Sequence, residues 1–165
     1  TVPPEDLECA WLACEAVYAP EELIRGKMEG NYDLIESHVY LKSDAHASSY
    51  LVVRSRPSPD TVYVVFRGTQ DLSDMIADFN CQPREIDTID DLAESLYVHG
   101  GIYETSKQSM KKIFARLNEE NQRRPIVKVI FTGHSLGGAC ALAARFIALE
   151  QAELQATTSK MAKRS

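Results

Sequence analysis

A serine lies between two glycines in the segment Gly133-His134-Ser135-Leu136-Gly137. A Gly-x-Ser-x-Gly pattern at a turn between a strand and a helix is typical of a serine held for nucleophilic attack on an acyl carbon. The glycines let the backbone pass close to itself without Cβ clashes. Amides at the start of the following helix point at the same place, where they stabilise a developing negative charge. The pattern therefore predicts acyl-transfer chemistry at Ser135.

The segments on both sides of this turn make the pattern a stronger signal. Residues 126–131 form a short apolar run rich in β-branched side chains, which predicts a buried strand. Residues 139–144 are small and favour helix, and the helix is expected to end near Leu154. Without a strand and a helix around it, Gly-x-Ser-x-Gly is a weak signal. The alternative is a glycine-rich turn whose serine takes no part in chemistry.

Composition excludes several classes of function. The chain has 165 residues, of which 44% are hydrophobic, and a net charge of −6. These values predict one domain, residues 1–156, followed by a polar tail at 157–165. The negative charge disfavours nucleic acid as a partner, and no apolar run reaches transmembrane length. The four cysteines lack metal-like spacing, so we expect no metal or nucleotide cofactor, and unpaired thiols favour the cytoplasm.

A helix is predicted at the start of the chain, where Pro3 and Pro4 precede two acidic residues. Its apolar positions recur at helical spacing and are expected to pack on the core, with Trp11 as a packing anchor. These positions are Leu7, Trp11, Cys14, Val17 and Tyr18. A shorter helix is expected at residues 22–25.

The middle of the chain predicts mainly strands. The strand candidates are residues 34–42, 49–54 and 61–66, with a further short strand at 97–99 that ends in a glycine turn. Residues 81–94 are polar and acidic and are expected to form a loop. Residues 102–118 are predicted to form a helix before the strand that leads to Ser135.

The segment 71–80 has two interpretations. If it is helical, Leu72, Met75, Ile76 and Phe79 form one apolar stripe, with aspartates on the other side. In the first interpretation the stripe docks a small helix on the core. In the second it belongs to a mobile lid over the serine that offers its apolar side to a lipid-like substrate.

Three local patterns occur together in this chain: Val65-Phe66-Arg67-Gly68-Thr69, Val98-His99-Gly100-Gly101-Ile102, and residues 132–139 around the serine. In this combination they resemble the class 3 (fungal-type) lipase family of α/β-hydrolases. The resemblance covers roughly residues 1–150. It implies an α/β fold with a mostly parallel sheet and helices on both faces, truncated here after the helix that follows Ser135.

The resemblance also implies roles for single residues. Ser135 matches the nucleophile, and Gly133, His134 and Gly137 match the turn that holds it. Leu136 and Thr69 match the two oxyanion-hole positions, and Leu72, Met75, Ile76 and Phe79 fall where the family carries its lid. His99 lies in a signature position with a structural role. The implied activity is hydrolysis of a neutral lipid, such as a triacylglycerol, or of a small ester.

The residues that activate such a serine are missing. In this family an aspartate and then a histidine follow the serine, but the thirty residues after Ser135 contain neither. Glu150 and Glu153 lie about 20 Å along the helix and cannot orient a base. The upstream histidines, at positions 38, 46 and 99, have no evident route to the serine. We therefore expect a fragment that is inactive or very weak by itself.

Two further expectations follow from the truncation. The sheet should have an exposed edge beside the strand that leads to Ser135, and its partner is either the missing C-terminal half or another chain. The alternative function is a lipase-like binding or regulatory module that has lost turnover.

Overall fold

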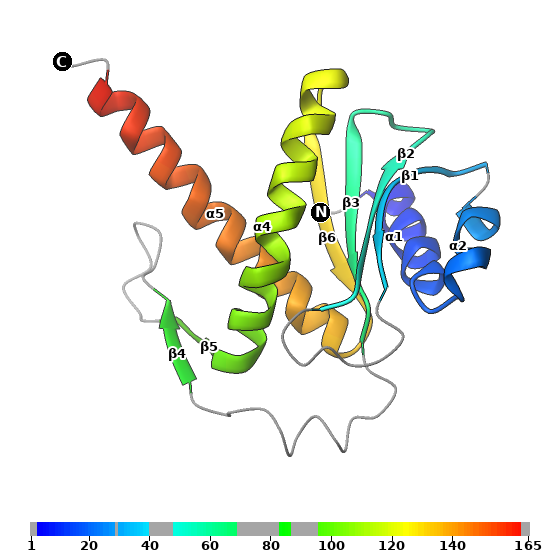
Figure 1. Cartoon of the computed structure of the whole chain (residues 1–165), viewed down its shortest axis with the longest axis horizontal. Helices are drawn as coiled ribbons and strands as arrows, with labels where there is room; N and C mark the ends of the chain where they lie inside the picture. The colour runs from blue at the N-terminus through cyan, green and yellow to red at the C-terminus, as the bar shows by residue number, and fades with distance from the viewer. Residues whose placement is uncertain (1–2, 29, 40–47, 69–82, 87–95, 163–165) are drawn as a thin grey trace.

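A central sheet carries helices on both faces in the computed structural model, which describes residues 3–28, 30–39, 48–68, 83–86 and 96–162 (Figure 1). The elements in chain order are α1 (Pro4–Ala16), α2 (Glu21–Met28), β1 (Tyr32–His38), β2 (Tyr50–Ser55), β3 (Thr61–Phe66), β4 (Pro83–Ile86), β5 (Leu96–His99), α4 (Gly100–Arg123), β6 (Lys128–Gly133) and α5 (Leu136–Ala162).

The sheet has the strand order β1-β2-β3-β6. It is mixed rather than mostly parallel, because β1 pairs with β2 and β2 with β3 in antiparallel fashion, and only β3 and β6 are parallel. The reason lies in the connections. A short turn between β2 and β3 permits only an antiparallel pair, whereas the long connection through α4 returns the chain in the same direction. As expected, β6 lies at an edge of the described sheet.

Alternating side chains of β2 and β3 fill two separate cores. Val52, Val62 and Val64 face α4 and α5, while Leu51, Val53 and Val65 face α1 and α2. Every residue of β2 and β3 is buried, as expected for strands that are covered on both faces. Helices on both faces of the sheet are thus confirmed.

The predicted core face of the first helix is wrong at Leu7 and Trp11, whereas Cys14, Val17 and Tyr18 do belong to or pack against the core. Leu7 and Trp11 have exposed fractions of 59% and 65%, so Trp11 is not a packing anchor. The buried residues of α1 are Asp6, Ala13 and Ala16. Small residues let α1 approach the sheet closely, and Asp6 accepts hydrogen bonds from Tyr63 Oη at 3.2 Å and Lys128 Nζ at 2.8 Å. The larger apolar residues therefore point outward.

Several boundaries also differ from the predictions. A strand, β4, lies inside the segment expected to be a loop, because it pairs with β5 in a separate antiparallel pair. The predicted short helix at 22–25 is α2, which is longer at both ends. α4 and α5 likewise extend beyond the expected helices, and α5 continues to Ala162. No helix in the described ranges is long and apolar enough to cross a membrane.

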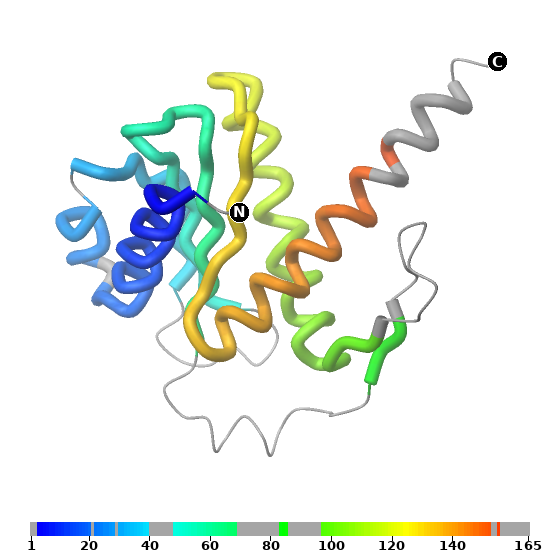
Figure 2. Tube along the Cα trace, turned by 180° about the vertical axis from the view of Figure 1, so that it is seen from behind, coloured from blue at the N-terminus to red at the C-terminus, as the bar shows by residue number. Residues whose placement is uncertain are grey.

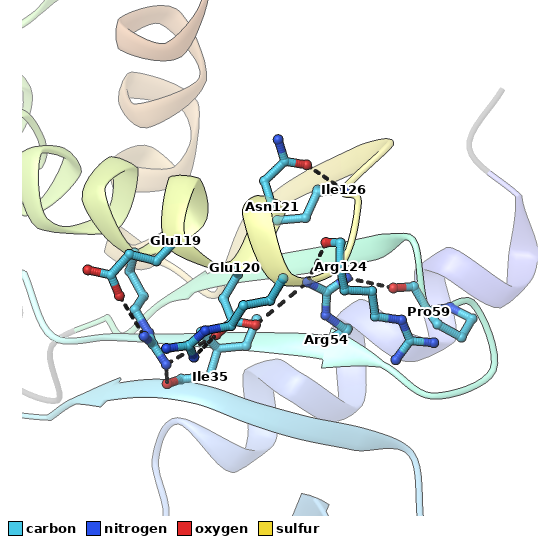
Figure 3. A network of polar contacts seen from close by, with 10 residues as sticks. Ile35, Arg54, Pro59, Glu119, Glu120, Asn121, Arg124 and Ile126 are labelled. Atoms are coloured by element: carbon cyan, nitrogen blue, oxygen red, sulfur yellow. Dashed lines mark hydrogen bonds and ion pairs between the residues drawn. The ribbon is translucent and has the colours of Figure 1, made fainter.

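A polar network fixes the beginning of β6 (Figure 3). Arg54 is 3% exposed at the end of β2 and donates to the carbonyl oxygens of Pro59, at 2.7 Å, and Arg124, at 3.2 Å. Its guanidinium also lies 3.7 Å from Glu120 of α4. Asn121 Oδ1 accepts from the Ile126 amide at 2.8 Å. The network joins the sheet, the end of α4 and the segment that enters β6.

We predict that Ile113→Ala lowers the free energy of unfolding by about 2–5 kcal/mol, because Ile113 is fully buried between α4 and the sheet. Trp11→Ala serves as the comparison and should change it by less than about 0.5 kcal/mol, as exposed positions do. Urea denaturation followed by circular dichroism measures both. A loss for Trp11→Ala as large as that for Ile113→Ala would contradict this description of α1.

Candidate active site

The turn around Ser135 joins the end of β6 to the start of α5. Ser135 is exposed and has φ 55°, and it is the only residue other than glycine with positive φ in the described ranges. This conformation is rare for a serine and costs of order 1–3 kcal/mol, so the surroundings must hold it. The Gly137 amide donates to the His134 carbonyl at 3.0 Å and the Gly138 amide to the Ser135 carbonyl at 2.9 Å. The turn expected between a strand and a helix is therefore present, and its backbone is strained at Ser135.

Glycines bring two backbone segments into direct contact at this turn. A Cβ atom on Gly137 would lie 2.2 Å from the Phe66 carbonyl oxygen, at the end of β3. A Cβ atom on Gly133 would lie 2.3 Å from the backbone carbon of Gly137. Both distances are too short for real Cβ atoms, so any side chain would push the turn away from β3. Gly133 also pairs with Phe66 in the sheet register, so the contact lies at the carboxyl end of both strands.

A third glycine extends this contact into the loop that follows β3. The Gly68 amide donates to the Tyr18 hydroxyl at 3.0 Å. A Cβ atom on Gly68 would lie 2.6 Å from the His134 carbonyl oxygen and 2.7 Å from the Tyr18 hydroxyl. The Arg67 guanidinium lies over the Tyr18 ring, 5.5 Å from its centroid. Tyr18 therefore holds the segment that leads to Thr69.

Sequence reasoning missed this function of Tyr18. The helical spacing placed Tyr18 on the core face of the first helix, but α1 ends at Ala16 and Tyr18 follows its C-cap, Val17. After the end of a helix the 3.6-residue period no longer sets the direction of a side chain. No local signal in the sequence indicates that this hydroxyl meets an amide fifty residues away.

Two cysteine thiols contact the elements that position the serine. Cys14 Sγ lies 3.4 Å from Thr132 Oγ1 on β6, and Cys140 Sγ lies 3.4 Å from Ser48 Oγ beside α5. Burial raises the pKa of both thiols, and the hydroxyl contacts offset this only in part. Because the thiol and not the thiolate is favoured, both cysteines are packing groups here. The cysteines of the described ranges are free, as expected.

The predicted site residues separate into two groups. Gly133, His134, Ser135, Leu136 and Gly137 come together in one turn, with His134 exposed. Thr69 and the expected lid residues fall outside the described ranges. These lid residues are Leu72, Met75, Ile76 and Phe79.

Two of the chain's histidines have structural contacts. His99 caps α4, where its Nδ1 accepts from the Ile102 amide at 3.4 Å, so the expected structural role is observed. His38 lies on β1 and stacks on Tyr50, with 5.3 Å between the ring centroids. Three strand spacings, about 14 Å, separate β1 from β6, which is too far for a hydrogen bond to Ser135.

The acidic candidate Glu150 has a structural partner, and the described residues form no metal site. Glu150 accepts from the Tyr103 hydroxyl at 2.8 Å, which joins α5 to α4. Burial, and then this bond to a carboxylate, raises the pKa of Tyr103 to about 12. Within the ranges that the structure describes, no group of histidine, cysteine, aspartate and glutamate residues is placed to hold a metal ion.

Comparison with known proteins gives one family. The family model described as Lipase (class 3) matches residues 63–163. The lipase of Rhizomucor miehei is 33% identical over 85 residues, which make up 52% of this chain and 22% of that protein. A crystal structure of the lipase from Rhizopus microsporus var. chinensis aligns with a TM-score of 0.65 at 26% identity, covering 93% of this chain and 54% of that one.

A second solved structure has the same fold. It is a triacylglycerol lipase whose catalytic centre is a serine-protease triad, and it aligns with a TM-score of 0.60 at 23% identity, covering 87% of this chain and 55% of that one. The α/β-hydrolase fold is thereby confirmed for the part that this chain covers. The chain spans about a fifth of the curated relative's length and just over half of the solved lipase chains.

We predict that Gly137→Ala and Gly133→Ala each lower the free energy of unfolding by at least about 2 kcal/mol, because the added methyl group meets rigid backbone atoms. Gly26→Ala is the matched control. It lies in α2 with nothing within 4 Å of its Cβ position, so it should raise stability by about 0.5–1 kcal/mol. Thermal and urea unfolding measure the three variants. Tolerance of alanine at Gly137 would contradict the close backbone contact.

We predict that Tyr18→Phe lowers the free energy of unfolding by about 1–3 kcal/mol and speeds hydrogen exchange of the Gly68 amide, because a buried donor loses its acceptor. The phenylalanine ring still offers a face to Arg67, so the variant isolates the hydroxyl. Tyr97→Phe, at a position 59% exposed, is the control and should change neither quantity. Amide exchange measured by NMR decides the matter, and an unchanged rate at Gly68 would refute the prediction.

Proposed function

The chain belongs to the class 3 lipase family, and we propose that it carries the nucleophile and the oxyanion hole of a serine carboxylic-ester hydrolase. The observation that supports this most strongly is the backbone of Ser135. It is exposed at φ 55° between the end of β6 and the start of α5, in contact with the end of β3. Such strain persists only where the surrounding structure enforces it, and it occurs most often at functional sites.

In the proposed reaction, Ser135 Oγ attacks the carbonyl carbon of an ester, and the carbonyl oxygen becomes an oxyanion. The alcohol leaves, an acyl-enzyme remains, and water then releases the acid. The amides of Leu136 and Thr69 are the proposed donors to the oxyanion. Donors of this kind are typically worth about 3–4 kcal/mol of barrier each.

Two features of the described residues support these donors. Leu136 is the first residue of α5, and an amide at that position has no acceptor within its own helix. The next two amides, of Gly137 and Gly138, are already bonded to His134 and Ser135. Thr69 directly follows Gly68, whose position against His134 is set by close contact, and one residue spans only about 3.8 Å between Cα atoms.

The group that accepts the proton of the Ser135 hydroxyl is proposed to lie outside the described residues. A serine hydroxyl is a weak nucleophile until a base removes its proton, and the base needs an orienting partner. We propose that an aspartate and a histidine on a further polypeptide segment complete the site, as the triad of the related triacylglycerol lipase suggests. A lipase-like binding or regulatory module without turnover is the second candidate.

The proposed substrate is a neutral ester, such as an acylglycerol. The apolar stripe of residues 72–79 is proposed as a lid that offers its apolar side to the acyl chain. The aspartates at positions 71, 74 and 78 and the net charge of −6 disfavour strongly anionic substrates.

We predict that the purified chain hydrolyses a short-chain p-nitrophenyl ester at a rate near background, because the described His38 and His99 make structural contacts elsewhere and do not serve Ser135 as a base. A fluorophosphonate probe should accordingly label it slowly or not at all. Ser135→Ala is the control and should match the unmodified chain in both assays. Robust hydrolysis that disappears in Ser135→Ala would show that a base already exists within the chain.

A further inference from the structure

The turn between β2 and β3 carries the only serine or threonine of the chain that is followed by proline. Residues 55–60 read Ser-Arg-Pro-Ser-Pro-Asp, so Ser58 has a proline on each side. A residue before proline is disfavoured in the helical region, and the two prolines therefore favour an extended backbone at Arg56 and Ser58. Because proline has no amide N–H, a kinase site that offers no acceptor after the modified residue selects proline there.

The hydroxyl of Ser58 is open to an enzyme that approaches this turn. Positions 56–60 are all exposed or half-buried. The Ser58 amide donates to the Ser55 hydroxyl at 3.1 Å, and the Ser58 carbonyl accepts from the Thr61 amide at 2.9 Å. The hydroxyl itself makes no hydrogen bond with any residue that the structure describes. Modification of this oxygen therefore breaks no side-chain hydrogen bond of the turn.

Arg124, at the end of α4, lies beside the same turn. Its carbonyl oxygen and that of Pro59 accept from one guanidinium, that of the buried Arg54, at 3.2 and 2.7 Å. Its side chain extends towards Pro59 (Figure 3) and, among the residues that the structure describes, forms no ion pair. Figures 1 and 2 both show the β2–β3 turn next to the segment between α4 and β6. An exposed, unpaired guanidinium is thus held next to the turn that carries Ser58.

A second guanidinium belongs to Arg56, two residues before Ser58. Its Nε lies 2.7 Å from Asp33 Oδ1, but both side chains are about half-exposed, so this pair contributes little and exchanges easily for a stronger one. A phosphoserine carries about −1.5 to −2 charges and three acceptor oxygens, which a guanidinium binds through two parallel hydrogen bonds. The acid nearest in sequence, Asp60, is exposed and carries a single charge. The two arginines therefore outweigh its repulsion.

We propose that Ser58 is a phosphorylation site for a proline-directed protein kinase, and that Arg56 and Arg124 bind the phosphate. In the transfer, Ser58 Oγ forms a bond to the γ-phosphorus of a nucleoside triphosphate held by the kinase. The bond from this phosphorus to the oxygen that bridges to the β-phosphate breaks, and the nucleoside diphosphate leaves. A base of the kinase takes the hydroxyl proton.

The phosphate acts on the beginning of the strand that leads to Ser135. The Asp60 carbonyl already accepts from the amides of Val127 and Lys128, at 2.9 and 3.2 Å. A phosphate bound by Arg124 adds a further link between the same two segments, so that the beginning of β6 opens less often. This end of the sheet is opposite to Ser135, which follows the other end of β6. The modification therefore stabilises the strand without contacting the serine.

The site is tested by incubating the full 165-residue chain with a purified mitogen-activated protein kinase and magnesium ATP. Peptide mass spectrometry is expected to place one phosphate on Ser58. Pro59→Ala should lower the rate of incorporation at least about tenfold, because the kinase then meets an amide N–H that it cannot pair. Pro57→Ala, at the proline before Ser58, is the matched control and should keep the rate within about twofold. No phosphate on Ser58, or equal rates for the two variants, would overturn the assignment.

The role of Arg124 is tested on the phosphorylated chain. Hydrogen exchange of the Val127 and Lys128 amides is expected to slow at least about threefold, and a phosphorus NMR titration should place the second pKa of the phosphate below its ordinary value of about 6. Arg124→Gln should remove the slowing. Arg123→Gln is the control and should retain it, because that guanidinium is already paired with Glu120 at 3.2 Å.

Unchanged or faster exchange after phosphorylation would overturn the proposed phosphate site, as would slowing that persists in Arg124→Gln. These measurements require no ester hydrolysis by the chain. Their outcome is therefore independent of the function proposed for Ser135.

Discussion

The contact between the backbone at the end of β3 and the backbone of the serine turn is the constraint on which the site depends. It requires glycine at positions 68, 133 and 137, because a Cβ atom at any of them would lie within 2.6 Å of a backbone atom. A side chain would force the two segments apart, and Gly68 would then move away from the serine turn. The strain at Ser135 is maintained by this contact and by the pairing of Gly133 with Phe66.

Several polar contacts fix the beginning of β6, the strand that leads to Ser135. At the beginning, the buried Arg54 joins β2 to the end of α4, and the Asp60 carbonyl accepts from the amides of Val127 and Lys128 at 2.9 and 3.2 Å. Asp6 adds a side-chain link from α1 to β3 and β6 through Tyr63 and Lys128. Burial, together with the nearby Cys9 and Asp6, raises the pKa of Tyr63, so its hydroxyl remains a donor to the carboxylate. The register of β6 with β3 is therefore fixed before the chain enters the serine turn.

The edge of β6 that faces away from β3 has no neighbouring strand in the described sheet. A strand with apolar residues on both faces is stable in water only when its neighbours cover it, and here one neighbour is absent from the described sheet. Ser135 follows the carboxyl end of this strand and is exposed.

The sequence by itself determined the features that short-range chemistry controls. The β-branched run at 61–66 is β3 with the predicted boundaries, and the glycines around Ser135 gave the strand, turn and helix in the right order. The family resemblance followed from the same motifs, and the family match confirms it. Only the tertiary structure decided that Trp11 faces solvent, that Tyr18 holds the Gly68 amide, that β4 pairs with β5 and that the sheet is mixed. Each of these depends on contacts between segments far apart in the chain, and local periodicity carries no information about which distant surface a side chain will meet.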